Sequence, residues 1–267
     1  MKRLFISADI EGTCGIAHWA ETDLDNGRSE YFRIQMSKEV ASACKGAIRA
    51  GFDEIIIKDA HDSACNIIPT YLPRQAKIIR SWARNPLSMV AGVDMGVNAM
   101  ICTGYHSAAS MNTNPLAHTM TSVGIYSLKI NGLLASEFVM NTYAAGFYGV
   151  PCVMLTGDKG LCESAKSFVK GIKTVPVSEG IGNASLSIHP ELACELIEET
   201  AFEALSGDLK KKEVKKEKEY EVEVSYKDHF KAYRASFYPG AYAVDAMTTG
   251  FKSNDYFEVM KFYMFCI

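Results

Sequence analysis

Two carboxylates stand where an apolar segment near the start of the chain ends. Asp9 and Glu11 follow the apolar residues 4–8 and are followed by Gly12. Alternate side chains of an extended chain lie on one face, so both acids are expected to leave the strand on the same side. Two close carboxylates repel each other, and a divalent cation would keep both ionised at neutral pH. An acidic turn after a strand is the alternative, since aspartate and glycine are common in turns.

Three further candidate metal ligands stand at the expected end of a strand or start of a helix: His61, His106 and Glu137. The carboxyl ends of parallel strands lie along one rim of a sheet, where open α/β sheets hold their sites. Mixed carboxylate and imidazole donors suit zinc or a similar divalent ion. Because one catalytic zinc takes about three ligands from the protein, the five candidates predict a two-metal site in which Asp9 bridges the ions.

Each of these residues also has an ordinary structural explanation. A single histidine after a strand is commonly a hydrogen-bonded loop residue. The helix dipole favours an acid in a first helical turn, which is where Glu137 falls. Asp59 and Asp62 flank His61 and could either orient its ring or form a turn. The shared position at one rim favours the metal site, and His118, on a long polar loop, falls in the same region.

The order of the expected elements predicts an α/β fold with a largely parallel sheet between layers of helices. A strand at residues 4–8, a helix at 29–50 with apolar residues at a period near four, and a strand at 54–58 form a βαβ unit. Ser29 is the expected N-cap of this helix and Gly51 its expected stop.

The remaining expected elements follow along the chain. Strands are predicted at residues 76–82, 99–103, 123–130, 152–155, 174–177, 184–188 and 220–226. Helices are predicted at residues 86–92, 135–148, 158–169 and 190–205. Asp158 is the expected N-cap of the third of these helices. Because the pattern changes to short strands after residue 172, we expect a metal-binding catalytic α/β domain at 1–172 and a smaller C-terminal α+β domain at 173–267, with oligomer contacts.

The composition excludes several classes of protein. Of the 267 residues, 48% are hydrophobic and 22% charged, and a net charge of −3 gives no field that would attract nucleic acid or a membrane. No apolar run approaches the roughly 18 residues of a membrane-spanning helix, and the N-terminal apolar run is too short for a signal peptide. The eight cysteines lack C-x-x-C spacing and mostly fall in apolar segments, which is typical of reduced cysteines in a cytoplasmic protein.

Five short motifs, in this order, resemble the zinc-dependent D-aminopeptidase family encoded with dipeptide-transport genes. They are S-A-D-I-E-G at Ser7–Gly12, D-A-H at Asp59–His61, G-Y-H at Gly104–His106, A-H-T at Ala117–Thr119 and N-G-x-x-x-S-E at Asn131–Glu137. The helix containing Asn141 and a region around Met247 continue the resemblance, which therefore covers nearly the whole chain. No single motif is specific, but their order and spacing together are.

The resemblance implies a function, a ligand set and an assembly. It implies two zinc ions per subunit, with Asp9 bridging, Glu11 and His106 completing one site, and His61 and Glu137 the other. His118 matches the catalytic histidine of the family, for proton transfer, oxyanion stabilisation or nucleophilic attack. Members release N-terminal D-amino acids from short peptides and amides, and they assemble into rings of ten subunits.

Two other functions remain open from the residues themselves. The same ligand set would serve a two-metal hydrolase of another bond, such as a phosphoester or a cyclic amide. A non-catalytic, metal-stabilised protein for peptide binding or assembly is the alternative outside enzymes. A structural metal site is normally saturated by protein ligands and shielded, whereas this one is expected at an open rim beside a spare histidine.

Overall fold

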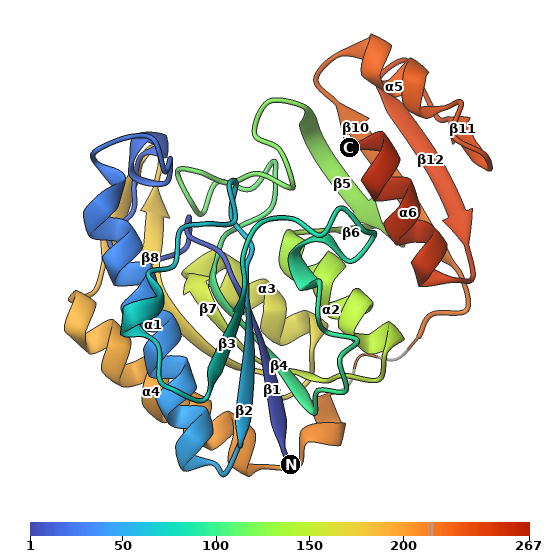
Figure 1. Cartoon of the computed structure of the whole chain (residues 1–267). Coiled ribbons are helices and arrows are strands. Elements are labelled where there is room, and N and C mark those ends of the chain that lie inside the picture. The colour runs from blue at the N-terminus through green and yellow to red at the C-terminus, as the bar shows by residue number, and fades with distance from the viewer. Residues whose placement is uncertain (213, 215) are drawn as a thin grey trace.

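The computed structural model describes residues 1–212, 214 and 216–267 (Figure 1). Its strands are β1 (Arg3–Ala8), β2 (Glu54–Asp59), β3 (Ala76–Ile79), β4 (Ala99–Tyr105), β5 (Ile125–Ile130), β6 (Leu133–Leu134), β7 (Cys152–Asp158), β8 (Lys173–Ile181), β9 (Ala184–Ser187), β10 (Tyr220–Tyr226), β11 (Ala241–Ala243) and β12 (Thr248–Ser253). Its α-helices are α1 (Ser29–Arg49), α2 (Glu137–Phe147), α3 (Lys159–Phe168), α4 (Pro190–Ser206), α5 (His229–Ala235) and α6 (Tyr256–Cys266). Short 3-10 helices lie at Trp19–Glu21, Pro69–Tyr71, Ser88–Val90 and Leu209–Lys212.

A seven-stranded sheet forms the centre of the molecule, with strand order β3-β2-β1-β4-β7-β8-β9. All neighbouring strands are parallel except β9, which pairs antiparallel with β8. The core strands are buried on both faces, as parallel strands between helical layers must be. The expected α/β fold with a largely parallel sheet is therefore confirmed.

The two faces of this sheet pack against different helices. Alternate residues of β1 show the division: Leu4 and Ile6 belong to one buried cluster and Phe5 to the other. The helices α1 and α4 pack on the first face and against each other, whereas α2 and α3 cover the second. The burial of these clusters holds the sheet between packed helices, so the strand ends that carry the polar residues have fixed positions.

A second, antiparallel sheet of five strands lies beside the first, in the order β11-β12-β10-β5-β6. Figure 1 shows it in the upper right, with β5 reaching it from the middle of the chain and α6 against it. Strand β10 has the expected bounds and alternates buried and half-buried side chains, so it has one apolar face. The helix α6 packs on that sheet and against α2.

The sheets do not divide the chain at residue 172. Strands β8 and β9 continue the first sheet, and α4 packs on α1, although all three follow that position. Strands β5 and β6 precede it but belong to the second sheet. The division into residues 1–172 and 173–267 stays a prediction about folding units, and the sheets themselves are interleaved along the chain.

Three local predictions were wrong. Ser29 is the first residue of α1 and not its cap, since its hydroxyl donates to the carbonyl of Asn26. The expected strand at 76–82 ends at Ile79, because Ser81 has a positive φ of 62° that interrupts an extended chain. The expected helix at 86–92 is only a 3-10 turn, which begins at Ser88 with a φ of 47°. Among the helices in the described part of the chain, none has the length and apolar content to span a membrane.

Candidate metal centre

The topology brings the five candidate ligands to one rim of the seven-stranded sheet. Strand β1 lies between β2 and β4, with Ala8 opposite Asp59 on one side and Thr103 on the other. Asp9, directly after β1, therefore stands between the ends of two neighbouring strands. His61 follows β2 and His106 follows β4, so the histidines reach Asp9 from opposite sides.

The ligand atoms form two groups that share Asp9, and a third group consists of Glu11, His106 and His118. On one side, Nδ1 of His61 lies 3.4 Å from Oδ1 of Asp9 and 3.0 Å from Oε2 of Glu11. On the other side, Nε2 of His106 lies 3.5 Å from Oδ2 of Asp9 and 3.4 Å from Oε2 of Glu137. In each group the three donor atoms lie within 4.8 Å of one another, which is a separation that a single metal ion can span.

The grouping differs from the one that the resemblance implies. There, Glu11 is paired with His106, and His61 with Glu137. In the structure, Glu11 lies with His61 and, in the group that includes His118, also with His106. Glu137 lies with His106, and no group of the described residues joins it to His61. The strand order explains why His61 and Glu137 are apart: His61 follows β2, whereas α2, which begins at Glu137, packs against β4. The position of Asp9 between the groups agrees with the bridging role, which stays a prediction.

Each histidine near the centre is oriented by a backbone carbonyl. Nε2 of His61 lies 3.1 Å from the carbonyl oxygen of Thr22, and Nδ1 of His106 lies 3.0 Å from that of Ser107. Because a carbonyl only accepts, each of these nitrogens carries the hydrogen in the neutral ring. The other nitrogen of each ring then presents its lone pair to the carboxylates. A ligand histidine is normally held by such a hydrogen bond.

The acids and histidines of the centre fit a divalent metal. Three of their atoms, Oδ2 of Asp9, Oε2 of Glu11 and Nε2 of His106, are buried and have no hydrogen-bond partner among the described residues. Leaving such atoms unpaired is costly. A bound metal would satisfy all three at once, and the donor set of carboxylates and imidazoles is the one that zinc takes.

The pKa values of the three carboxyl groups are shifted in different directions. Burial and the neighbouring charge of Glu11 raise the pKa of Asp9 well above its ordinary value. Burial would also raise the pKa of Glu11, but the nearby histidines, His61 above all, outweigh it and hold that pKa well below the usual range. The pKa of Glu137 is lowered because His106 outweighs burial in the same way. A cation between these groups would let all the acids ionise together.

The two histidines of the centre share the opposite shift. Burial alone would lower the pKa of His61 and of His106, but the surrounding carboxylates outweigh burial and raise both well above the ordinary value. The surrounding carboxylates therefore favour the protonated form of both rings. A metal would have to displace those protons, so its affinity is expected to fall in acid.

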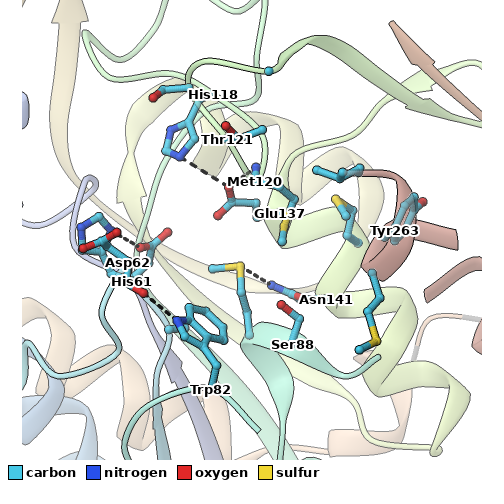
Figure 2. A pocket seen from close by; sticks show the side chains of 18 of the residues that line it. His61, Asp62, Trp82, Ser88, His118, Met120, Thr121, Glu137, Asn141 and Tyr263 are labelled. Atoms are coloured by element: carbon cyan, nitrogen blue, oxygen red, sulfur yellow. Dashed lines mark hydrogen bonds and ion pairs between the residues drawn. The ribbon is translucent and has the colours of Figure 1, made fainter. Parts of the chain in front are cut away.

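His118 lies over the centre and has a different electrostatic character. Its Nε2 is 3.8 Å from a carboxylate oxygen of Glu11. It is also 3.8 Å from one of Glu137, the contact that a dashed line marks in Figure 2. Its ring stacks on that of His106, with the centroids 4.2 Å apart. Burial and the neighbouring His106 lower the pKa of His118, so its ring is neutral at pH 7. Its Nδ1 is bound to the carbonyl of Leu116, which leaves Nε2 free as a base.

Buried acids hold the loops that carry these residues. The carboxylate of Asp59 accepts from the backbone of Asn66 at 2.6 Å and of Ile67 at 2.8 Å, so it forms a turn and does not touch the ring of His61. Asp158 caps α3 as predicted, and it also accepts from the backbone and hydroxyl of Ser107. The loop that leads to His118 is thus fixed at its beginning.

Two residues near the centre were not among the predicted site residues. The ring of Trp19 lies edge-on to His118 with centroids 5.2 Å apart, and nothing in the local sequence marks it. Asn141 lies one turn after Glu137 on α2, a spacing that puts the two residues on one helix face. Both line a cavity of about 1180 Å³ that includes Asp9, Glu11 and His118. The cavity is large enough for a short peptide.

Comparisons with known proteins agree with this geometry. The family model Peptidase_M55, D-aminopeptidase, matches residues 1–265. A D-aminopeptidase of Bacillus subtilis (strain 168) is 28% identical over 264 residues, which cover 97% of this chain and 94% of that protein. The solved structure of the Zn-dependent D-aminopeptidase DppA from Bacillus subtilis, a self-compartmentalizing protease, is similar with a TM-score of 0.91 and 25% identity, over 98% of this chain and 95% of that one. The chain belongs to the Peptidase_M55 family of D-aminopeptidases, and it is a metal-dependent peptidase.

Proposed function

We propose that this protein is a two-zinc aminopeptidase that releases N-terminal D-amino acids from short peptides or amides. The observation that carries the proposal is Asp9, whose two oxygens face two separate sets of ligand atoms. One set would consist of Asp9, Glu11 and His61, and the other of Asp9, His106 and Glu137. The similarity to a Zn-dependent enzyme supports zinc as the metal.

The residues of the site have separate roles in hydrolysis. Two bound zinc ions would supply an acidified water, with a pKa of about 7, and polarise the scissile carbonyl. His118 holds an unprotonated Nε2 at the cavity, where it accepts the proton of the attacking water and returns it to the leaving amine. Glu11 and Glu137 face this nitrogen and stabilise the imidazolium while it carries the proton.

A direct attack by His118 on the substrate is the competing mechanism. It would form an acyl-histidine intermediate, which has no evident advantage over activated water for an unactivated amide. Mass spectrometry of enzyme quenched during turnover distinguishes the two. An acyl group trapped on His118 would refute the water mechanism.

The test is product release from D-Ala-D-Ala and from L-Ala-L-Ala by zinc-reconstituted protein, with His118→Ala as the blank. Preference for the D-peptide, lost in the variant, is the expected result. Activity on the L-peptide alone would leave the peptidase and refute the D-stereochemistry. No cleavage of either peptide, with two metals bound, would indicate another bond, such as a phosphoester, or a binding role.

A chelator separates a catalytic metal site from a structural one. We expect removal of zinc to stop turnover while the protein stays folded. The apolar clusters on the two faces of the first sheet are buried without any contribution from the metal centre. Unfolding on chelation would instead support a metal-stabilised binding or assembly protein.

We further propose that the chain is a cytoplasmic homo-oligomer. Its helix α5 and the following residues expose large aromatic side chains, Phe230, Tyr233 and Phe237, at 59–70%, which is unusual for a monomer surface. The similarity to a self-compartmentalizing protease supports an assembly. The ring of ten subunits stays a prediction, which a molar mass measured by light scattering would test. The eight free cysteines, six of them buried, support a reducing compartment.

A further inference from the structure

Asn141 lies beside the proposed metal centre without being one of its ligands. It follows Glu137 by four residues on α2, so both side chains lie on one helix face, about 6 Å apart along the axis at a rise of roughly 1.5 Å per residue. Its side chain is 7% exposed and lines the cavity between Glu137 and Ser88 (Figure 2). Asn141 is therefore nearly buried, and its side chain belongs to the cavity wall.

A chain of hydrogen bonds behind Asn141 fixes the orientation of its amide. Nδ2 of Asn141 lies 2.9 Å from the hydroxyl of Tyr105, which lies 2.6 Å from the hydroxyl of Ser7. The hydroxyl of Ser7 in turn donates to the backbone carbonyl of Met89 at 2.8 Å. Each hydroxyl has one hydrogen, and the carbonyl can only accept. Ser7 therefore gives its hydrogen to Met89, Tyr105 gives its hydrogen to Ser7, and Asn141 must donate to Tyr105.

This direction leaves the carbonyl oxygen of Asn141 as a fixed acceptor. A flipped amide would place two acceptors, Oδ1 and the tyrosine oxygen, against each other without a hydrogen between them. The second hydrogen of Nδ2 is also turned inward, to the sulfur of Met89 at 3.4 Å. Oδ1 receives no hydrogen bond from any residue that the structure describes. A preoriented acceptor at a cavity wall matches an N–H or O–H group of a ligand.

We infer that Oδ1 of Asn141 binds the free α-amino group of the substrate, an inference that rests on the proposed aminopeptidase function. The amino group, as ammonium, is the one polar group of an N-terminal residue that only donates. The scissile carbonyl and a carboxylate are acceptors and would be repelled by the amide oxygen. Asn141 thus binds the free amino group, which distinguishes the N-terminal residue of a peptide from an internal residue.

The test compares D-alanine with propionate as competitive inhibitors, because the two differ only by the amino group. Zinc-loaded wild-type protein is expected to bind D-alanine more tightly. Asn141→Leu keeps the volume but has no acceptor, so the ratio of the two inhibition constants should fall by about 10- to 100-fold, the loss of one hydrogen bond to a charged group. Asn141→Asp loses the N–H that is donated to Tyr105 but keeps an acceptor oxygen, and its negative charge attracts ammonium and repels propionate, so the ratio should not fall.

Two further measurements separate binding from structure. Tyr105→Phe leaves Oδ1 in place but removes the partner that orients it, so the ratio should fall a few-fold even if Asn141→Leu does not fold. Zinc content and melting temperature check that each variant is intact. An unchanged ratio in folded Asn141→Leu or in Tyr105→Phe would overturn the inference. Wild-type protein that cleaves no peptide would refute the proposed function, while the ratio of the dissociation constants of D-alanine and propionate, measured by calorimetry, would still test the amine contact.

Discussion

Replacing Glu39 by glutamine should stabilise the protein at neutral and alkaline pH but not in acid. Glu39 lies in α1 and is 1% exposed. Its Oε1 accepts hydrogen bonds from the backbone of Cys14 and from the side chain of Gln35, each at 3.0 Å, whereas Oε2 is buried without a partner. Burial raises the pKa of this carboxyl to about 7, although the two hydrogen bonds oppose the rise.

The direction of the effect follows from where the proton is held. The unfolded chain loses the proton near the ordinary pKa of 4.5, whereas the folded chain keeps it up to about 7. Between these values the folded state binds more protons, so the free energy of unfolding falls as the pH rises. At about 1.4 kcal/mol for each tenfold change in proton affinity, the full cost above pH 7 is about 3 kcal/mol. Glutamine keeps the Oε1 acceptor and never ionises, so it escapes this cost.

The assay is urea unfolding of wild type and Glu39→Gln at pH 4.5, 6 and 8. The difference in unfolding free energy should be smallest at pH 4.5 and grow toward about 3 kcal/mol at pH 8. Glu195→Gln, on the exposed side of α4, is the matched control and should change little at any pH. A difference that does not vary with pH would refute the reasoning.

Three further predictions concern the centre and its scaffold. Asp9→Ala should lose both zinc ions and Glu11→Ala mainly one, because one oxygen of Asp9 faces His61 and the other faces His106. Full zinc content in Asp9→Ala, measured by elemental mass spectrometry, would contradict the bridging role. His118→Ala should keep zinc and melting temperature but lose about 10²–10⁴-fold in turnover, and an unchanged rate would leave His118 a structural residue. Gly12→Ala should fold poorly, since its Cβ would lie 1.8 Å from a backbone carbonyl oxygen, whereas Gly27→Ala has open space and should melt like wild type.

The local pattern of the sequence was enough to predict much of the scaffold. The apolar period of α1 and the run of β1 follow from which side chains must be buried, and both elements have nearly the predicted bounds. The crossover from β1 to β2 implied parallel strands, and their register confirms it. The shared rim followed from that, because parallel strands end on the same side.

The pattern could not identify the neighbours of each strand. Strands β8 and β9 lie late in the chain, and only the pairing of β8 with β7 and of β9 with β8 shows that they extend the first sheet. Strand β5 alternates like any half-buried strand, and only its pairing with β10 places it in the second sheet. Strand pairing depends on contacts between distant segments, which local periodicity does not record.

The sequence by itself determined which residue types stand at the strand ends, since their order and spacing are a property of the chain. Tertiary structure decided which of them meet: β1 between β2 and β4 puts Asp9 between His61 and His106, and it pairs Glu11 with His61. It also decided the orientation of Asn141, through hydroxyls that β1 and β4 supply. Distances and hydrogen-bond directions arise only when separate segments pack together, and the chemistry of this site depends on them.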